Sequence, residues 1–86
     1  MDIKTGSVVR ALAGREKGRY FVAVDVHDGF VYLADGKERK LGRPKKKNIK
    51  HISPVHRFIE TEQLTDRRLR QQLLRLSDEE KSSNDQ

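Results

Sequence analysis

The chain has 86 residues, of which 37% are charged and 34% hydrophobic, with a formal net charge of +6 and no cysteine. This length allows one small domain with a modest core and leaves no room for an enzyme with a two-domain cleft. The composition excludes disulfides and thiolate metal sites, and no apolar run reaches the ~20 residues of a membrane span. Since no basic segment followed by an apolar block opens the chain, we expect a cytoplasmic protein.

The positive charge is concentrated in the first two thirds of the chain. Residues 1–57 contain fourteen basic and six acidic residues, whereas residues 58–86 contain five basic and seven acidic ones. Because the excess positive charge is concentrated in residues 1–57 and not spread over the whole chain, this part is the candidate for binding a polyanion.

The first 57 residues are predicted to form short β-strands joined by turns. Valine and aromatic residues dominate the runs, and turns such as Asp28-Gly29 and Asp35-Gly36 separate them. Runs this close together favour antiparallel neighbours, and so small a sheet must curl to bury one face. The predicted fold class is therefore mainly β, a small half-open barrel of about five strands. The predicted strands are residues 7–13, 19–26, 30–34, 37–41 and 48–53.

Side-chain alternation along the second strand assigns its two faces. The charged Asp25 marks its own face, which includes Phe21 and Ala23, as the outer one. Val31 and Leu33 of the next strand are predicted to lie inside. The opposite, core-facing side of the second strand is then predicted to consist of Tyr20, Val22, Val24 and Val26.

The last third of the chain changes to a helical pattern. Leu69, Leu73 and Leu76 recur on one helical stripe, Thr65 fits an N-cap, and Leu64 and Leu69 have the spacing of a hydrophobic staple. A helix of about three turns is marginal alone in water, so it needs a covering surface. The barrel, a second copy and a partner protein all remain open as that surface.

These patterns divide the chain into three parts. Residues 1–57 are predicted to form the barrel, and residues 58–76 a linker and the amphipathic helix. Residues 77–86 are polar and are predicted to be a disordered tail.

A known family resembles part of this pattern. The segment GREKGRYFVAVDV resembles the KOW motif, with Gly18 opening the second strand after a basic turn. Together with VYLADG and RPKKKNIKH, it is similar to the KOW-containing archaeal and eukaryotic-type large-subunit ribosomal proteins and their short bacterial relatives. The resemblance covers residues 3–57. It implies an SH3-like β-barrel that binds RNA, ribosomal RNA included, and associates with the ribosome.

The run RPKKKNIKH is the first candidate for an RNA contact. Its ammonium groups repel one another unless a polyanion lies beside them, and phosphates that replace their counterions make binding steeply dependent on salt. The alternative is a solvated edge loop whose lysines block strand addition. Because Asn48 and His51 stand where a strand resumes directly after the lysines, we predict that the run is anchored to the barrel.

The first turn is the second candidate. Gly14 and Gly18 allow positive φ, so backbone N–H groups can approach a phosphate beside Arg15, Lys17 and Arg19. The resemblance implies that this turn contacts RNA. The alternative is a hairpin with merely solvated charges, which Glu16 favours because it lowers the local positive potential.

Some roles stay open at this stage. Asn48 fits a turn residue better than a base-reading one, and His51 either stacks on a base or lies partly buried with a backbone bond. An outward Phe21 or Tyr32 would form a base-stacking platform, and core packing is the alternative. The candidate RNA-binding residues are Arg10, Arg15, Lys17, Arg19, Arg39, Lys40, Arg43, Lys45, Lys46, Lys47, Lys50 and His51, with the motif glycines Gly14 and Gly18.

The residues do not favour catalysis. The three histidines have no metal-ligand spacing, and the glycines form neither a P-loop nor a dinucleotide fingerprint. We therefore expect no enzyme activity, cofactor, metal, membrane contact or small-molecule substrate. The alternative function is an adaptor for the ribosome or the transcription machinery, which would dock through the barrel or through Leu69, Leu73 and Leu76.

Overall fold

A computed structural model describes residues 3–84, with side chains as far as Glu79. Within these residues the protein forms five β-strands, a short 3₁₀ turn at Ile49–His51 and one α-helix, α1 (Asp66–Asn84). The strands are β1 (Ser7–Ala11), β2 (Tyr20–His27), β3 (Phe30–Ala34), β4 (Lys45–Asn48) and β5 (Ile52–Phe58).

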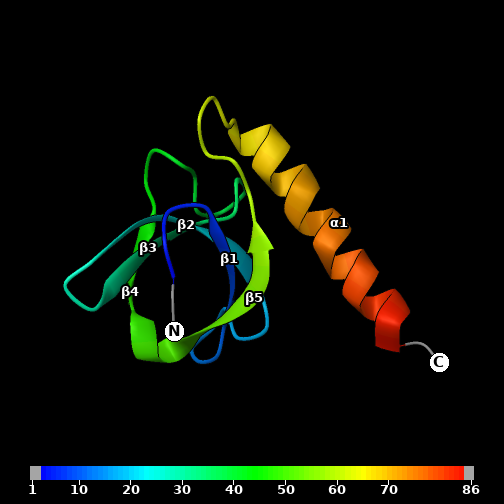
Figure 1. Ribbon diagram of the computed structural model, residues 1–86, viewed down its shortest axis with the longest axis horizontal. Helices are drawn as coiled ribbons and strands as arrows, with labels where there is room; N and C mark the ends of the chain where they lie inside the picture. The colour runs from blue at the N-terminus through cyan, green and yellow to red at the C-terminus, as the bar shows by residue number, and fades with distance from the viewer. Residues whose placement is uncertain (1–2, 85–86) are drawn as a thin grey trace.

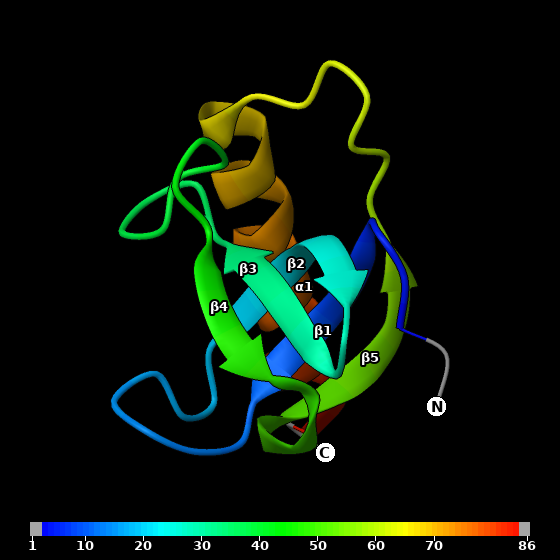
Figure 2. The same cartoon turned by 90° about the vertical axis from the view of Figure 1, so that its left-hand side faces the viewer.

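All neighbouring strands are antiparallel, in the order β4-β3-β2-β1-β5. Figure 1 shows the sheet curled on itself with α1 along one side, and Figure 2 shows α1 behind the curled sheet. The short hairpin turn at Asp28-Gly29 has positive φ at both residues, 55° and 76°, as a type I′ turn requires. The prediction of a mainly β, SH3-like barrel of five strands followed by a helix is confirmed.

The last two strands do not lie where the sequence pattern predicted them. Residues 37–41 form a loop instead of a strand, because the Asp35 carboxylate accepts hydrogen bonds from the backbone N–H groups of Lys37 and Arg39, both at 2.9 Å. The fourth strand is the lysine run itself, β4. The predicted strand 48–53 is divided between the end of β4, the 3₁₀ turn and the start of β5.

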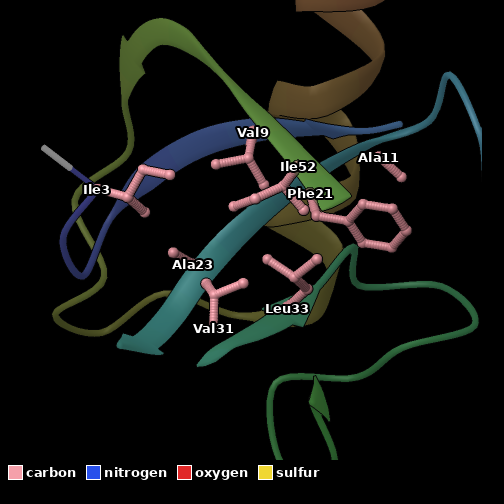
Figure 3. Packing of buried hydrophobic residues seen from close by; sticks show 8 residues of the cluster. All are labelled: Ile3, Val9, Ala11, Phe21, Ala23, Val31, Leu33 and Ile52. Atoms are coloured by element: carbon pink, nitrogen blue, oxygen red, sulfur yellow. The ribbon is translucent and has the colours of Figure 1, made fainter. Parts of the chain in front are cut away.

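The barrel interior holds one hydrophobic cluster, whose side chains point toward one another between the strands in Figure 3. Val31 and Leu33 lie inside it as predicted, with Val26 packed against it. Burying a residue of this size stabilises the fold by about 1.5–3 kcal/mol before chain entropy is subtracted. The cluster consists of Ile3, Val9, Ala11, Phe21, Ala23, Val31, Leu33 and Ile52.

The predicted faces of β2 were wrong as far as Val24. Phe21 and Ala23 point into the barrel, whereas Tyr20, Val22 and Val24 lie on the outer side of the sheet. The pairing of β2 with β3 shifts between Ala23 and Asp25, which marks a β-bulge. Val24 and Asp25 therefore both lie on the outer side, and the alternation reverses after them. The charge of Asp25 therefore does not predict the side of the sheet on which Phe21 and Ala23 lie, because both precede the bulge.

The outer side of the sheet is also apolar where α1 covers it. Val8, Val22 and Ala34 form a second cluster with Leu69 and Leu73 of the helix. Partly buried residues complete this outer cluster at its margin, among them Tyr20, Val24, Leu41, Val55, Leu64 and Leu76. The sheet is thus buried on both faces where α1 covers it.

Local contacts fix the start of α1. The Thr65 hydroxyl accepts a hydrogen bond from the Arg68 N–H at 3.2 Å, so the predicted N-cap is confirmed. The Asp66 carboxylate accepts one from the Leu41 N–H at 2.7 Å. A Cβ at Gly36 would lie only 2.2 Å from the Asp66 carbonyl oxygen, so glycine allows the loop to touch the helix backbone.

The helix is longer than predicted. It continues through Asn84 and takes in most of the stretch that was predicted to be a disordered tail, while residues 85 and 86 lie outside the described residues. No helix among the described residues has both the length and the apolar character that a membrane span needs.

Candidate nucleic-acid interface

The turn between β1 and β2 carries the first group of candidate residues. Gly14 and Gly18 have φ values of 82° and 88°, as the sequence predicted for this turn. The Gly18 N–H donates to the Ala11 carbonyl at 2.8 Å, which closes the turn onto the end of β1. Arg15 and Lys17 are exposed at its tip.

Glu16 is the centre of the site, although its neighbours in the turn are exposed. Its side chain is only 9% exposed, and its carboxylate accepts hydrogen bonds from Lys45 Nζ at 2.7 Å and Arg39 Nε at 3.2 Å. Lys47 Nζ lies 4.0 Å away. One carboxylate therefore holds the β1–β2 turn, the β3–β4 loop and strand β4 together, and the two basic segments meet on one side of the molecule.

The electrostatics of this group keep Glu16 ionised. Burial alone would raise the pKa of its carboxyl, but the hydrogen bonds from Lys45 and Arg39 and their charges outweigh burial and lower the pKa below its ordinary 4.5. We call Arg15, Glu16, Lys17, Arg39, Lys45 and Lys47 the Glu16 cluster. It contains five cations and one carboxylate, so its local charge remains strongly positive.

The three consecutive lysines of β4 point in different directions. Lys47 is nearly buried, with 11% of its side chain exposed, and its Nζ donates to the Ala13 carbonyl at 2.9 Å. Lys45 reaches Glu16 on the same side of the strand. Lys46 points to the other side, with its Nζ 4.3 Å from the centroid of the Phe30 ring. The run is part of the sheet, as predicted, but two of its three ammonium groups have internal partners.

An open depression of about 440 Å³ lies beside the Glu16 cluster. Arg19 hydrogen-bonds Glu38 within this lining, which raises the pKa of Arg19. The depression is lined by Arg15, Glu16, Arg19, Glu38, Arg39 and Lys45. The lining thus carries four cations and two carboxylates, and its net charge is positive.

Several other candidate residues are exposed, among them Lys40, Arg43 and Lys50. His51 is exposed too, so the buried alternative for its ring is wrong. Its carbonyl accepts from the Leu12 N–H at 2.9 Å, which places the 3₁₀ turn beside the start of the β1–β2 turn.

Asn48 and Arg10 have different places. The Asn48 side chain accepts from the Lys50 N–H at 2.9 Å and caps the 3₁₀ turn, which confirms its assignment as a turn residue. Arg10 lines a separate depression with Tyr20 and Ser53. The structure does not bring it to the Glu16 cluster.

The leucine stripe of the helix faces the protein's own sheet. Leu69 is fully buried, Leu73 is 6% exposed, and Leu76 packs at the edge of the same outer cluster. The surface that covers the helix is thus the protein's own barrel, and the docking of a partner protein through these leucines stays a prediction.

The exposed side of α1 carries cations that were not among the predicted RNA-binding residues. Arg67, Arg68, Arg70 and Arg75 are all exposed, and Arg70 lines a depression of about 340 Å³ that also contains Arg19 and Lys37. The segment RRLR supplies three of them, and the acidic residues around it make residues 58–86 negative as a whole.

Fold and site together define a small SH3-like β-barrel with a basic surface at its β1–β2 turn and fourth strand. No family model matches the sequence. A comparison with curated proteins finds similarity to the large ribosomal subunit protein eL14 of Staphylothermus marinus, with 36% identity over 59 residues. The aligned part is 67% of this chain and 62% of the relative, so the chain spans less than two thirds of the relative's length. This similarity supports a KOW-type, ribosomal-protein-like relationship.

Proposed function

We propose that the protein is a non-catalytic RNA-binding module that works with the ribosome in the cytoplasm and holds structured RNA, ribosomal RNA in particular. The observation that carries the proposal is the Glu16 cluster, whose contacts join two basic segments 23 to 34 residues apart in the sequence into one surface. The similarity to a large-subunit ribosomal protein supports the same function.

Recognition by this surface rests on phosphates and shape. The A-form major groove hides base edges from side chains, so cations at fixed positions are the suitable contacts for a folded RNA. Arg15 and Lys17 are exposed on the turn. Arg43 is exposed in the loop before β4, Lys50 is exposed on the 3₁₀ turn, and Lys46 is exposed on the other side of β4. In this proposal Glu16 fixes the scaffold, and the exposed cations contact the RNA.

The salt dependence of RNA binding tests the proposal. Each phosphate contact contributes a slope of about 0.7–0.9 to the fall of log affinity with log salt concentration. The double change Arg15→Gln and Lys17→Gln should therefore weaken binding to a folded ribosomal RNA fragment and reduce the slope by roughly 1.5. Both side chains are exposed, so the thermal unfolding temperature should stay close to that of the unchanged protein.

A matched control is available on α1. Arg68→Gln with Arg75→Gln removes the same charge from exposed positions on the helix. The proposal expects this control to leave the slope nearly unchanged. If both double variants lose the same amount of RNA affinity, only the net charge matters. If the wild-type protein does not bind RNA even at low salt, the proposal is wrong. Cross-linking in cells with sequencing of the retained RNA would identify the target.

A further inference from the structure

Three rings gather on the outer side of the sheet, at the end that carries the β2–β3 hairpin. The rings of His27 and Tyr32 are stacked, with centroids 5.3 Å apart and planes inclined by 30°. Phe30 lies on the same strand as Tyr32, two residues away and hence on the same side, with Lys46 over its ring. We call His27, Phe30 and Tyr32 the aromatic platform.

The helix does not cover this part of the sheet. The outer cluster beneath α1 takes up Ala34 at the far end of β3, and the hairpin extends to the opposite side of the barrel from α1 (Figure 1). The His27 side chain is 53% exposed, and Phe30 and Tyr32 are half-buried. The three rings are thus partly accessible to solvent, and none of them belongs to the hydrophobic clusters of the core.

Charge is distributed unevenly along the platform. Lys46 stands at one border, on the strand whose other side holds the Glu16 cluster. At the hairpin end, carboxylate oxygens of Asp25 and Asp28 lie 3.5 Å from the two ring nitrogens of His27. Phosphates are therefore attracted to the β4 border and repelled from the hairpin tip. An uncharged, flat group attached to a phosphate fits this gradient.

We propose that the aromatic platform stacks an unpaired base of the bound RNA, with the phosphate of that nucleotide on the Lys46 border. This inference rests on the proposed function and deepens it, because it names the chemical group that the second surface takes. Aromatic side chains stack bases of any sequence, and a neighbouring cation holds the backbone. The ligand class is thus a folded RNA with a bulged or looped-out nucleotide next to a helical segment.

The test compares two RNA hairpins, one with a single bulged nucleotide and one with that nucleotide deleted. Tyr32→Leu and His27→Ala should each lower the affinity for the bulged hairpin by about five- to one-hundred-fold. Neither change removes a cation that contacts phosphate, so the salt slope should remain that of the unchanged protein. Tyr32→Phe, which keeps a ring, should retain the affinity.

Phe58→Leu is the matched control. Phe58 is an exposed ring with Lys4 Nζ 5.4 Å from its centroid, but it lies on β5 at the other edge of the sheet. Its removal should leave both affinities unchanged. His27 is exposed at the hairpin end, so His27→Ala keeps the test valid if Tyr32→Leu unfolds the protein.

The outcomes separate this inference from the proposed function. If the platform variants bind both hairpins as tightly as the unchanged protein does, the platform takes no base, while the function carried by the Glu16 cluster stands. If these variants instead lose a bound protein and keep the bulged RNA, the platform is a protein surface and the inference is overturned. If the unchanged protein binds neither hairpin nor any folded ribosomal RNA in dilute buffer, the proposed function fails with it.

Discussion

The two sides of strand β4 carry the same residue type and use it in opposite ways. On the inner side, Lys45 and Lys47 reach Glu16 and the Ala13 carbonyl, so their charges close the barrel against the β1–β2 turn. On the outer side, Lys46 lies over an aromatic ring at the surface. Positive charge in a sequence is therefore not by itself a binding signal. The partner of each ammonium group decides whether it stabilises the fold or remains available to a ligand.

The largest expected effect concerns the shared acceptor of the inner side. Glu16→Ala should lower the free energy of unfolding by about 2–3 kcal/mol, because it removes two charge-assisted hydrogen bonds and leaves clustered cations unpaired. Urea unfolding followed by circular dichroism measures this change. Glu38→Ala is the control, since water screens its exposed pair with Arg19, which therefore contributes little to stability. Equal costs for the two variants would show that the inner side does not hold the fold.

A second variant tests whether Lys47 stabilises the fold or binds RNA. Lys47→Met keeps the aliphatic stem and loses the Nζ, so it should cost about 1–2 kcal/mol through the lost bond to the Ala13 carbonyl. Its salt slope for RNA should change little, because the Nζ already has an internal partner. If the Lys47→Met protein is as stable as the wild type and its salt slope is reduced, Lys47 contacts RNA instead of stabilising the fold. The two sides of β4 would then not differ in the use of their lysines.

Acid should weaken the inner side selectively. The pKa of Glu16 is lowered in the folded protein, so the unfolded chain takes up a proton first as the pH falls. The stabilisation from Glu16 is complete above its ordinary pKa of 4.5 and is lost as the pH falls through the lower folded value. Unfolding free energies measured across this range should therefore fall more steeply for the unchanged protein than for Glu16→Gln. Parallel curves would contradict the role of the ionised carboxylate.

The smallest stability effect is expected on the outer side. Lys46→Met should change the free energy of unfolding by less than about 1 kcal/mol, the usual worth of an exposed cation–π contact. Its salt slope for RNA should nevertheless fall by about 0.7–0.9. Lys4→Met, which removes a similar contact over Phe58, should match it in stability and leave the slope unchanged. A slope that falls equally in both variants would show that Lys46 has no special place in binding.

The features that the sequence predicted well are those with local causes. The turn at Asp28-Gly29, the positive φ of Gly14 and Gly18, and the N-cap at Thr65 each depend on residues a few positions apart. The helix stripe followed from its periodicity, and its length did not, because the residues after Leu76 have no apolar pattern and still continue the helix.

The features that the sequence did not predict depend on contacts between distant residues. In the sequence Glu16 only lowers the positive potential of its turn. Its partners lie 23 and 29 residues away and make it the centre of the site. Lysines have low strand propensity, and β4 forms because β3 offers a free edge and Glu16 offers a counter-charge. The bulge after Ala23 likewise has no signal in the alternation that it interrupts.

The outer cluster beneath α1 has a consequence for how this protein is made. Because the chain is synthesised from its N-terminus, all five strands are complete before the helix leaves the ribosome. Val8, Val22 and Ala34 therefore remain exposed to solvent until the last third of the chain has been made. A fragment that ends at Phe58 would leave this apolar surface exposed to solvent, and we expect such a fragment to self-associate. The helix is thus a built-in cover for a barrel that is incomplete without it.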